Sequence, residues 1–265
     1  MNATLQYIAD LERVNYAAML AVAQVTPGLD LIIRDDVIIT SSQTFPAPDT
    51  THACLLRATP QAADDLIAEV IDHFESRNLP TSIFVSPACT PSDLTGRLLS
   101  RGFVQQEASE AWLVLEDLQN FAMPATTCNI AVKLVTRDQV STFAALFMAA
   151  FGMPVDFAPY MAQLLEPCIG LPGVYHYLAV VAGQPIGTCS VLCYENFGIL
   201  GSAGVLPDHR RSGAATALAV QAATQALGQG VDTLVLQTAA GAPLERLLRI
   251  SGFKPAFIRT CYTLP

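Results

Sequence analysis

The sequence predicts an α/β (α+β) protein built from two similar halves, and three observations support this prediction. The chain has 265 residues, which is enough for two domains of ordinary size. In the C-terminal half, segments with the two-residue period of strands and segments with helical spacing follow one another as β-α-α-β-β-β-α-β-α-β. The N-terminal half shows a weaker copy of this plan, in which Gly102-Phe103 stands where Gly252-Phe253 stands in the second half.

The N-terminal half is expected to begin with a long helix and a hairpin. Asp35 and Asp36 separate two apolar runs, as is typical of a hairpin turn. Asp64 and Asp65 predict the start of a later helix, because carboxylates stabilise the amino-terminal end of a helix. The expected elements are a helix at 5–25, strands at 29–33, 37–40 and 52–56, a helix at 64–76, a strand at 84–85, a helix through 94–98 and a strand after 103.

The C-terminal half carries clearer periodicity. Val140, Phe143 and Phe147 recur at helical spacing, and Gly228 and Gly230 are typical of a helix end. The expected elements are a strand at 129–135, helices at 137–151 and 157–165, strands at 177–181, 186–194 and 199–205, a helix at 213–227, a strand at 234–237, a helix at 244–250 and a last strand ending near 264.

The boundary between the two halves is expected within residues 119–127. The run from Met123 to Thr127 reads as a linker, because it combines a proline with small and polar residues. We therefore predict one domain at 1–122 and a second at 128–265.

Composition argues against several classes of partner. The net charge is −9 and only 14% of the residues are charged, so the chain has no basic footprint for nucleic acid or for an anionic membrane. The longest uncharged run, 167–194, is interrupted by prolines and glycines and reads as two strands rather than a membrane span. A hydrophobic content of 52% favours a large apolar core or an interface, which makes a homodimer a candidate assembly.

The chain start and the cysteines predict a cytoplasmic protein without a metal centre. No basic segment followed by an apolar one opens the sequence, so we expect no secretory signal. The seven cysteines are scattered and show no C-x-x-C pair, which is typical of reduced thiols and not of a metal site.

The segment from Val205 to Leu218 predicts a strand end, a tight loop and a helix start. Pro207 ends the strand, because proline cannot donate a ladder hydrogen bond, and Gly213 lets backbone amides come close to an anion. The alanine-rich run that follows is strongly helix-forming. Because the amino-terminal end of a helix presents free N–H groups and a positive dipole, the segment is suited to binding a pyrophosphate.

This segment resembles the acetyl-CoA loop of GNAT-type N-acetyltransferases, V-x-P-x-x-[QR]-x-x-G-x-[GA]. Val205, Pro207, Arg210, Gly213 and Ala215 match that pattern. The resemblance implies two GNAT-like domains, each a mixed, mostly antiparallel sheet flanked by helices, and acetyl-CoA as cosubstrate. It implies cofactor contacts from the strand backbone and from the loop, at Ala203, Gly204, Val205, Arg210, Arg211, Ser212, Gly213, Ala214, Ala215 and Thr216.

The N-terminal half is expected to have lost this site. In the repeat, Ala63 stands in place of the loop glycine and Asp65 in place of Ala215. Without the glycine the backbone cannot approach an anion closely, and Asp64 and Asp65 repel a pyrophosphate. We therefore predict one acetyl-CoA per chain.

The residues for proton transfer are less clear than the cofactor loop. Many GNAT enzymes carry a tyrosine general acid four residues before the Gly-Phe pair, whereas this chain has Leu248, with Tyr262 as a substitute candidate. The strand at 199–205 has no carboxylate base, so Glu195 and Asp156 are the candidates for the amine end of the pocket.

The resemblance predicts an N-acetyltransferase that moves an acetyl group from acetyl-CoA directly to a primary amine of a small molecule or protein, within a ternary complex. Leu248 and the carboxylate-free strand keep an alternative open, which is an acyl-CoA-binding regulatory protein without catalysis. A third hypothesis makes the N-terminal half a dimerisation or partner-binding module. No motif within 151–171 identifies the acceptor.

Overall fold

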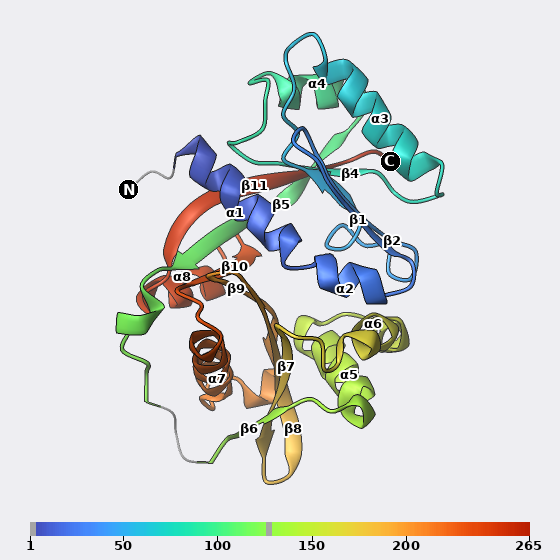
Figure 1. Ribbon diagram of the computed structural model, residues 1–265. Helices are drawn as coiled ribbons and strands as arrows, with labels where there is room; N and C mark the ends of the chain where they lie inside the picture. Colours follow the sequence, from blue (N-terminus) through green and yellow to red (C-terminus); the bar gives the residue numbers. More distant parts are fainter. Residues whose placement is uncertain (1–3, 126–128) are drawn as a thin grey trace. The chain divides into compact units, whose positions relative to one another are not determined.

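The computed structural model describes residues 4–125 and 129–265. Thr126 and Thr127 of the predicted linker, and Cys128 at the start of the predicted second domain, lie outside the described residues. The chain forms two compact units, and its path visits the first of them twice. Unit 1 comprises Met1–Val114 and Gln237–Pro265, and unit 2 comprises Leu115–Leu236 (Figure 1).

Unit 1 contains a mixed, mostly antiparallel sheet in the order β1-β2-β3-β4-β11-β5. Only the pairing of β3 with β4 is parallel in this series. The last strand of the chain, β11, therefore lies between two strands of the N-terminal half. The elements are α1 (Leu5–Ala17), α2 (Leu20–Val25), β1 (Leu29–Ile33), β2 (Ile38–Ser42), β3 (His52–Cys54), α3 (Ala63–Glu75), β4 (Ser82–Val85), α4 (Leu94–Ser100), β5 (Val104–Leu115), α8 (Pro243–Ile250) and β11 (Lys254–Thr263).

The two faces of this sheet are covered differently because strand side chains alternate. Helices α3 and α4 lie on one face, where Ile67, Phe74 and Leu98 pack against Ile83 and Tyr262. Helix α1 is associated with the opposite set of side chains, and it buries apolar residues such as Ile8 and Leu11 together with the polar Glu12 and Tyr16.

A buried ionic network joins α1 to β11. The Arg259 guanidinium pairs with Glu110 and lies 3.6 Å from Glu12 Oε1, and both Glu12 and Arg259 are buried. It also donates to Tyr16 Oη at 3.0 Å. Ser86 donates to the other Glu12 oxygen at 2.6 Å. Because removing one partner of a buried ion pair costs about 3–5 kcal/mol, this network ties β11 firmly to unit 1.

The strands of unit 2 follow one another in the order β10-β9-β8-β7-β6, in which β9 and β10 are parallel and the other neighbours antiparallel. The regular elements are β6 (Ala131–Leu134), α5 (Val140–Phe151), α6 (Ala158–Leu165), β7 (Val174–Val181), β8 (Gln184–Tyr194), β9 (Phe197–Val205), α7 (Ala214–Gly228) and β10 (Thr233–Ala239). Short 3-10 turns are Leu118–Asn120, Arg137–Gln139, Val155–Phe157, Glu166–Cys168 and Pro207–His209.

In unit 2, α5 and α6 cover one face of the sheet and α7 the other (Figure 1). Leu178 of β7 packs against Phe143 of α5, whereas the preceding residue, Tyr177, reaches Gln225 of α7. This alternation confirms the strand period expected from the sequence.

The element order confirms the predicted fold class and the similarity of the two halves. Both helix–glycine–phenylalanine corners have the same cap, in which the Phe103 and Phe253 amides donate to Leu98 and Leu248 carbonyls at 3.1 Å. Gly102 and Gly252 both adopt positive φ angles, of 90° and 98°. The same local structure thus recurs at the corresponding place in each half.

Two features of the structure differ from what the sequence predicts. The helix predicted at 5–25 is wrong as one element, because it breaks into α1 and α2 near Met19; no residue of α2 is buried, so packing does not hold it in line with α1. The compact units also divide the chain differently from the predicted domains 1–122 and 128–265, since β11 completes unit 1. That domain division, which concerns the repeated halves, stays a prediction.

Candidate functional site

Strands β9 and β10 separate part of the way along β9. Their parallel register runs from Phe197 to Leu200, whereas the register of β9 with β8 continues to Val205. Between Gly201 and Gly204, β9 carries one more residue than β8, and Ser202 there has a φ of 49°. This bulge lies just beyond the last residue paired with β10. The backbone of the following segment is therefore available on its β10 side.

The loop at 206–213 joins β9 to α7 and ends on a left-handed glycine. Gly213 has a φ of 92° and is the N-cap of α7, and Arg211 before it has a φ of 66°. Ser212 Oγ accepts from the Ala214 amide at 3.3 Å. Ala215, one residue further, is exposed. The amides of this first turn have no acceptor inside the helix, so the turn offers donors to an anion.

Helix α5 packs closely on the end of β9 and on this loop. A Cβ on Gly204 would lie 2.8 Å from Ala150 Cβ and 2.9 Å from the Phe151 ring. Arg210 donates to the Ala150 carbonyl at 3.2 Å. Gly204 therefore has a packing reason to be glycine, in addition to the backbone contact that the resemblance implies.

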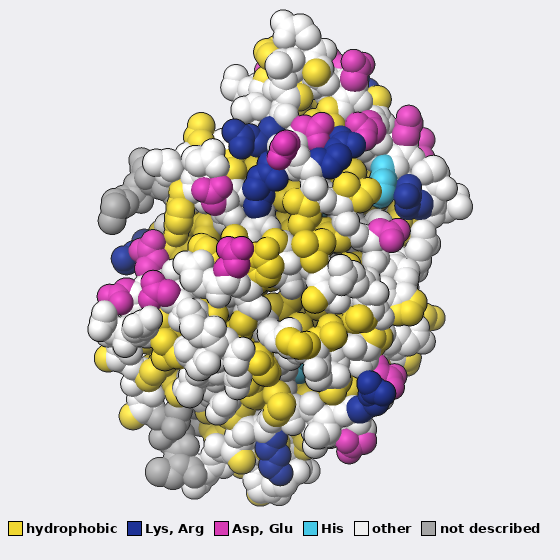
Figure 2. All heavy atoms as spheres, viewed as in Figure 1, with side chains coloured by type: hydrophobic (Ala, Val, Ile, Leu, Met, Phe, Trp, Pro, Cys, Tyr) yellow, Lys and Arg dark blue, Asp and Glu magenta, His cyan; other side chains and the backbone are white. Residues whose placement is uncertain are grey.

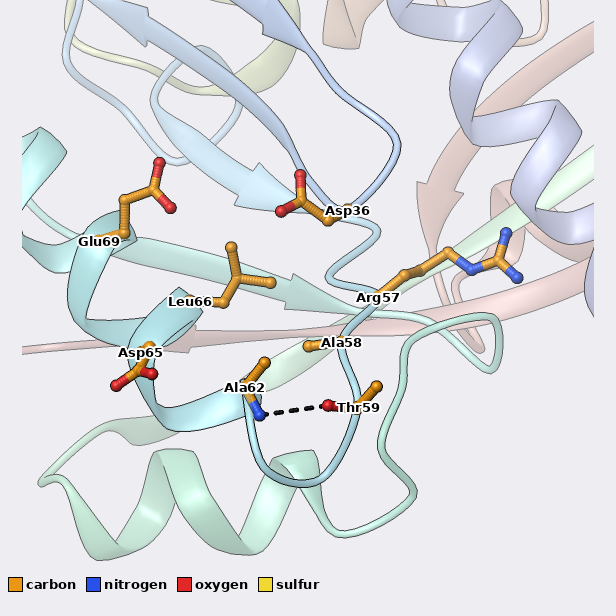
Figure 3. A pocket seen from close by; sticks show the side chains of 8 residues that line it. All are labelled: Asp36, Arg57, Ala58, Thr59, Ala62, Asp65, Leu66 and Glu69. Carbon is orange, nitrogen blue, oxygen red and sulfur yellow. Dashed lines mark hydrogen bonds between the residues drawn. The ribbon is translucent and has the colours of Figure 1, made fainter.

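Carboxylates line the corresponding place in the N-terminal half, and Arg34 pairs with two of them, Asp36 and Glu69. A pocket of about 400 Å³ lies beside the start of α3, and Figure 3 shows the carboxylates of Asp36, Asp65 and Glu69 around it, with the Arg57 side chain extending away from them. The α3 N-cap, Ala62, has an ordinary φ of −92° in contrast to Gly213. Both differences disfavour a pyrophosphate there.

The tyrosine candidate lies in the core of unit 1. Tyr262 is 5% exposed, packs in the cluster beneath α3 and α4, and donates to Gln105 Oε1 at 3.2 Å. Leu248 is half-buried in α8, also in unit 1. The 206–213 loop belongs to unit 2, so the compact unit that holds the loop contains neither residue.

The two carboxylate candidates occupy different ends of unit 2. Glu195 is exposed in the turn before β9, and at about 3.3 Å per residue that turn lies roughly 26 Å from the loop at the other end of the strand. Asp156 is exposed in the turn that follows α5, five residues beyond Phe151, which contacts Gly204. Of the two, Asp156 is the one that follows the helix packed against the loop.

One polar pair went unnoticed in the sequence. His176 on β7 and Ser190 on β8 are buried, with His176 Nδ1 2.7 Å from Ser190 Oγ. Burial lowers the pKa of His176 to about 4, so the imidazole is neutral near neutral pH. The hairpin around Ala182-Gly183 is a sequence signal that brings the two strands together, but a register shift between Ala179 and Val180, which has no such signal, sets Ser190 opposite His176.

The surface charges, the possible metal ligands and the helices each bear on the kinds of site that the described residues form. On the face shown in Figure 2, basic side chains lie beside acidic ones and form no continuous basic stripe. Within residues 4–125 and 129–265, no three His, Cys, Asp or Glu side chains are grouped as metal ligands. None of the helices in those ranges has the length and apolar character needed to cross a bilayer.

Comparison with known proteins agrees with this architecture. Residues 141–253 match the acetyltransferase (GNAT) family model. A GCN5-related N-acetyltransferase from Kribbella flavida has 17% identity and a TM-score of 0.69, with 94% of this chain and 95% of that one covered. A conserved protein of unknown function from Staphylococcus epidermidis has 12% identity and a TM-score of 0.66, over 94% and 98%.

A third solved structure shares the tandem arrangement. It is a tandem GNAT protein from the clavulanic acid biosynthesis pathway, with 15% identity, a TM-score of 0.61 and coverage of 93% of this chain and 86% of that one. At these identities the likeness concerns the fold. No curated protein sequence is significantly similar to this chain.

Proposed function

We propose that this protein, whose residues 141–253 match the acetyltransferase (GNAT) family model, is an N-acetyltransferase that transfers the acetyl group of acetyl-CoA to a primary amine. The observation that carries the proposal is the left-handed Gly213 at the start of α7, directly after a strand that has parted from its neighbour. A helix start of this kind offers amides and a positive dipole to a pyrophosphate.

The residues present fit an acyl-CoA. The amides from Gly213 to Thr216 and the side chains of Arg210 and Arg211 would hold the pyrophosphate, since this end of α7 has no acidic residue in its first turn. The backbone of Ala203, Gly204 and Val205 would hold the pantetheine arm along the unpaired side of β9. When bound, the group would supply an activated acyl carbon. The amine nitrogen would form a bond to this carbon and lose a proton, while the carbon–sulfur bond breaks and the departing thiolate takes up a proton.

Direct transfer in a ternary complex is supported by the state of the thiols. Burial raises the pKa of Cys189 to about 12 and that of Cys193 to about 11, so neither is a ready nucleophile for a covalent intermediate. The six described cysteines are all free, which supports a reducing compartment such as the cytoplasm.

The acceptor end of the proposal rests on Asp156. Its carboxylate is the candidate partner for the acceptor's ammonium group, because it follows the helix that packs on Gly204. Tyr262 keeps only a packing role in this proposal, since its hydroxyl is committed to Gln105.

Two measurements test the function. Calorimetric titration with acetyl-CoA should give one site per chain, and a free-thiol assay over a panel of primary amines should show CoA release. A chain that binds acetyl-CoA but releases no thiol with any amine would favour the alternative, an acyl-CoA-binding regulatory protein. The carboxylate-free β9 is the observation that keeps this alternative in view. Failure to bind acetyl-CoA would contradict both.

A further inference from the structure

His176 and Ser190 form an isolated polar pair beneath α5. They are 6% and 3% exposed, and the edge of the imidazole meets the Phe143 ring at a centroid distance of 5.5 Å. A hydrogen bond of 2.7 Å between His176 Nδ1 and Ser190 Oγ joins the two side chains. Polar side chains that are buried this deeply and belong to no larger hydrogen-bond network need an explanation. A functional role is one of the few available explanations.

The direction of this hydrogen bond follows from the other ring nitrogen. His176 Nε2 is buried and has no hydrogen-bond partner in the described part of the chain. A buried N–H without an acceptor is rarer than a buried acceptor without a donor, so the hydrogen of the neutral ring belongs on Nδ1. His176 then donates to Ser190 Oγ, and the hydroxyl hydrogen of Ser190 is free to be donated elsewhere.

An opening lies beside that hydroxyl. Ser190 is directly opposite Gly201 in the β8–β9 register, so the side chain of Ser190 and the missing side chain of Gly201 share one face of the sheet. A Cβ on Gly201 would meet nothing within 4 Å, and the residue is only half-buried. Gly201 also directly follows Leu200, the last residue of β9 paired with β10.

We propose that Ser190 Oγ–H donates a hydrogen bond to the carbonyl oxygen of the bound thioester, and that His176 is a positioning residue that turns the hydroxyl toward it. This inference rests on the proposed function, in which the pantetheine arm follows β9 from Val205 back toward Gly201. Negative charge develops on the carbonyl oxygen when the amine attacks, and a donor fixed in advance stabilises that charge. Ser190 forms no covalent bond in this step and gives up no proton.

His176 remains the donor to Ser190 Oγ across the physiological pH range. The groups that face the imidazole are Phe143 of α5 and Ser190 of β8, and the Val135 amide donates to the His176 carbonyl. None of these is charged, and burial alone lowers the pKa of His176 to about 4. The ring therefore remains neutral, which suits a donor and makes His176 a poor base for activating Ser190 as a nucleophile.

The experiment is isotope-edited infrared spectroscopy of [1-13C]acetyl-CoA bound to the full-length protein. A hydrogen bond to the thioester carbonyl lowers its stretching frequency, so the wild-type complex should show a shift to lower frequency that Ser190→Ala loses and Ser190→Thr keeps. His176→Phe should weaken the shift, and the double variant should match Ser190→Ala because the two residues act as one unit. The double variant also leaves no buried polar atom unpaired if Ser190→Ala alone folds poorly.

Cys189→Ala is the matched control, because Cys189 is the buried neighbour of Ser190 on the opposite face of β8. It should keep the shift. The same carbonyl frequency in wild type and Ser190→Ala, with acetyl-CoA bound to both, would overturn the role of the hydroxyl while leaving the proposed function intact. An acetylated Ser190 found by mass spectrometry would overturn the donor assignment in favour of a nucleophile. No binding of acetyl-CoA by the wild type would instead overturn the proposed function, and this inference with it.

Discussion

Ala215 lies exposed in the first turn of α7, where an aspartate would face the pyrophosphate. We expect Ala215→Asp to weaken acetyl-CoA binding by several hundred-fold or more, because two like charges about 4 Å apart repel by about 4 kcal/mol at an effective dielectric near 20. Folding should be unharmed, since a carboxylate in a first turn stabilises a helix by about 0.3–1 kcal/mol. Titration beside a thermal melt checks both. Ala219→Asp, one turn further along the exposed face, is the control; equal losses would contradict the loop assignment.

His176 should make stability depend on pH. Its pKa is lowered from 6.5 to about 4 in the folded chain, so the unfolded chain binds the proton first as the pH falls. The free energy of unfolding should therefore decrease between about pH 6.5 and pH 4, by about 3 kcal/mol from this residue. Urea unfolding at several pH values should show a flatter decrease for His176→Phe. Parallel curves for the two proteins would argue against a buried neutral imidazole.

At the scale of elements, the contact between α5 and β9 depends on a missing side chain. Gly204→Ala would place a Cβ 2.8 Å from Ala150 and 2.9 Å from Phe151, so α5 must move, at a cost of about 1–3 kcal/mol. Gly201→Ala meets nothing within 4 Å and should leave the melting temperature nearly unchanged. Thermal melts of the two variants provide the comparison. A Gly204→Ala protein as stable as Gly201→Ala would mean that α5 does not seat on β9 as described.

Element types were predictable from the sequence because periodicity and glycine signals are local, as the helix and strand around Gly213 and Val205 illustrate. The pairing of side chains between strands was not. A regular hairpin closed at Ala182-Gly183 would set His176 opposite Cys189, and a bulge after Ala179 shifts the register so that Ser190 takes that place. One extra residue moves a side chain to the other face of a sheet, and no sequence period announces it.

At the scale of the whole molecule, the last strand should decide whether unit 1 folds. A chain that ends at Ile250 lacks β11, which pairs with both β4 and β5 and brings Arg259 to Glu12. We expect the amides of α3 and β4 to lose protection from hydrogen exchange in this truncated chain, while those of β7 and β8 in unit 2 stay protected. Unit 2 is thus the internal reference, and full protection of β4 after truncation would contradict the account.

The position of β11 between β4 and β5 also shows where sequence reasoning stops at this scale. The repeat correctly matches Gly102-Phe103 with Gly252-Phe253, but a repeat says only that two segments have the same shape. The pairing of strands depends on contacts between residues far apart in the sequence, such as Thr260 with Val85 and Arg259 with Glu110. The sequence around each of these residues does not indicate its partner. The strand, loop and helix start around Gly213 were predictable for the opposite reason, because all these parts lie within a few residues of one another. That this loop holds a cofactor stays a prediction.

The position of β11 has a consequence for biosynthesis. A ribosome makes the chain from its amino terminus, so the strand that fills the gap between β4 and β5 is synthesised after every other strand of the two units. Until then Glu12 has no cation to pair with, and two strand edges in the nascent N-terminal half stand open. Unit 2, by contrast, is complete once its contiguous segment has emerged. The half that was synthesised first is therefore the half that finishes folding last.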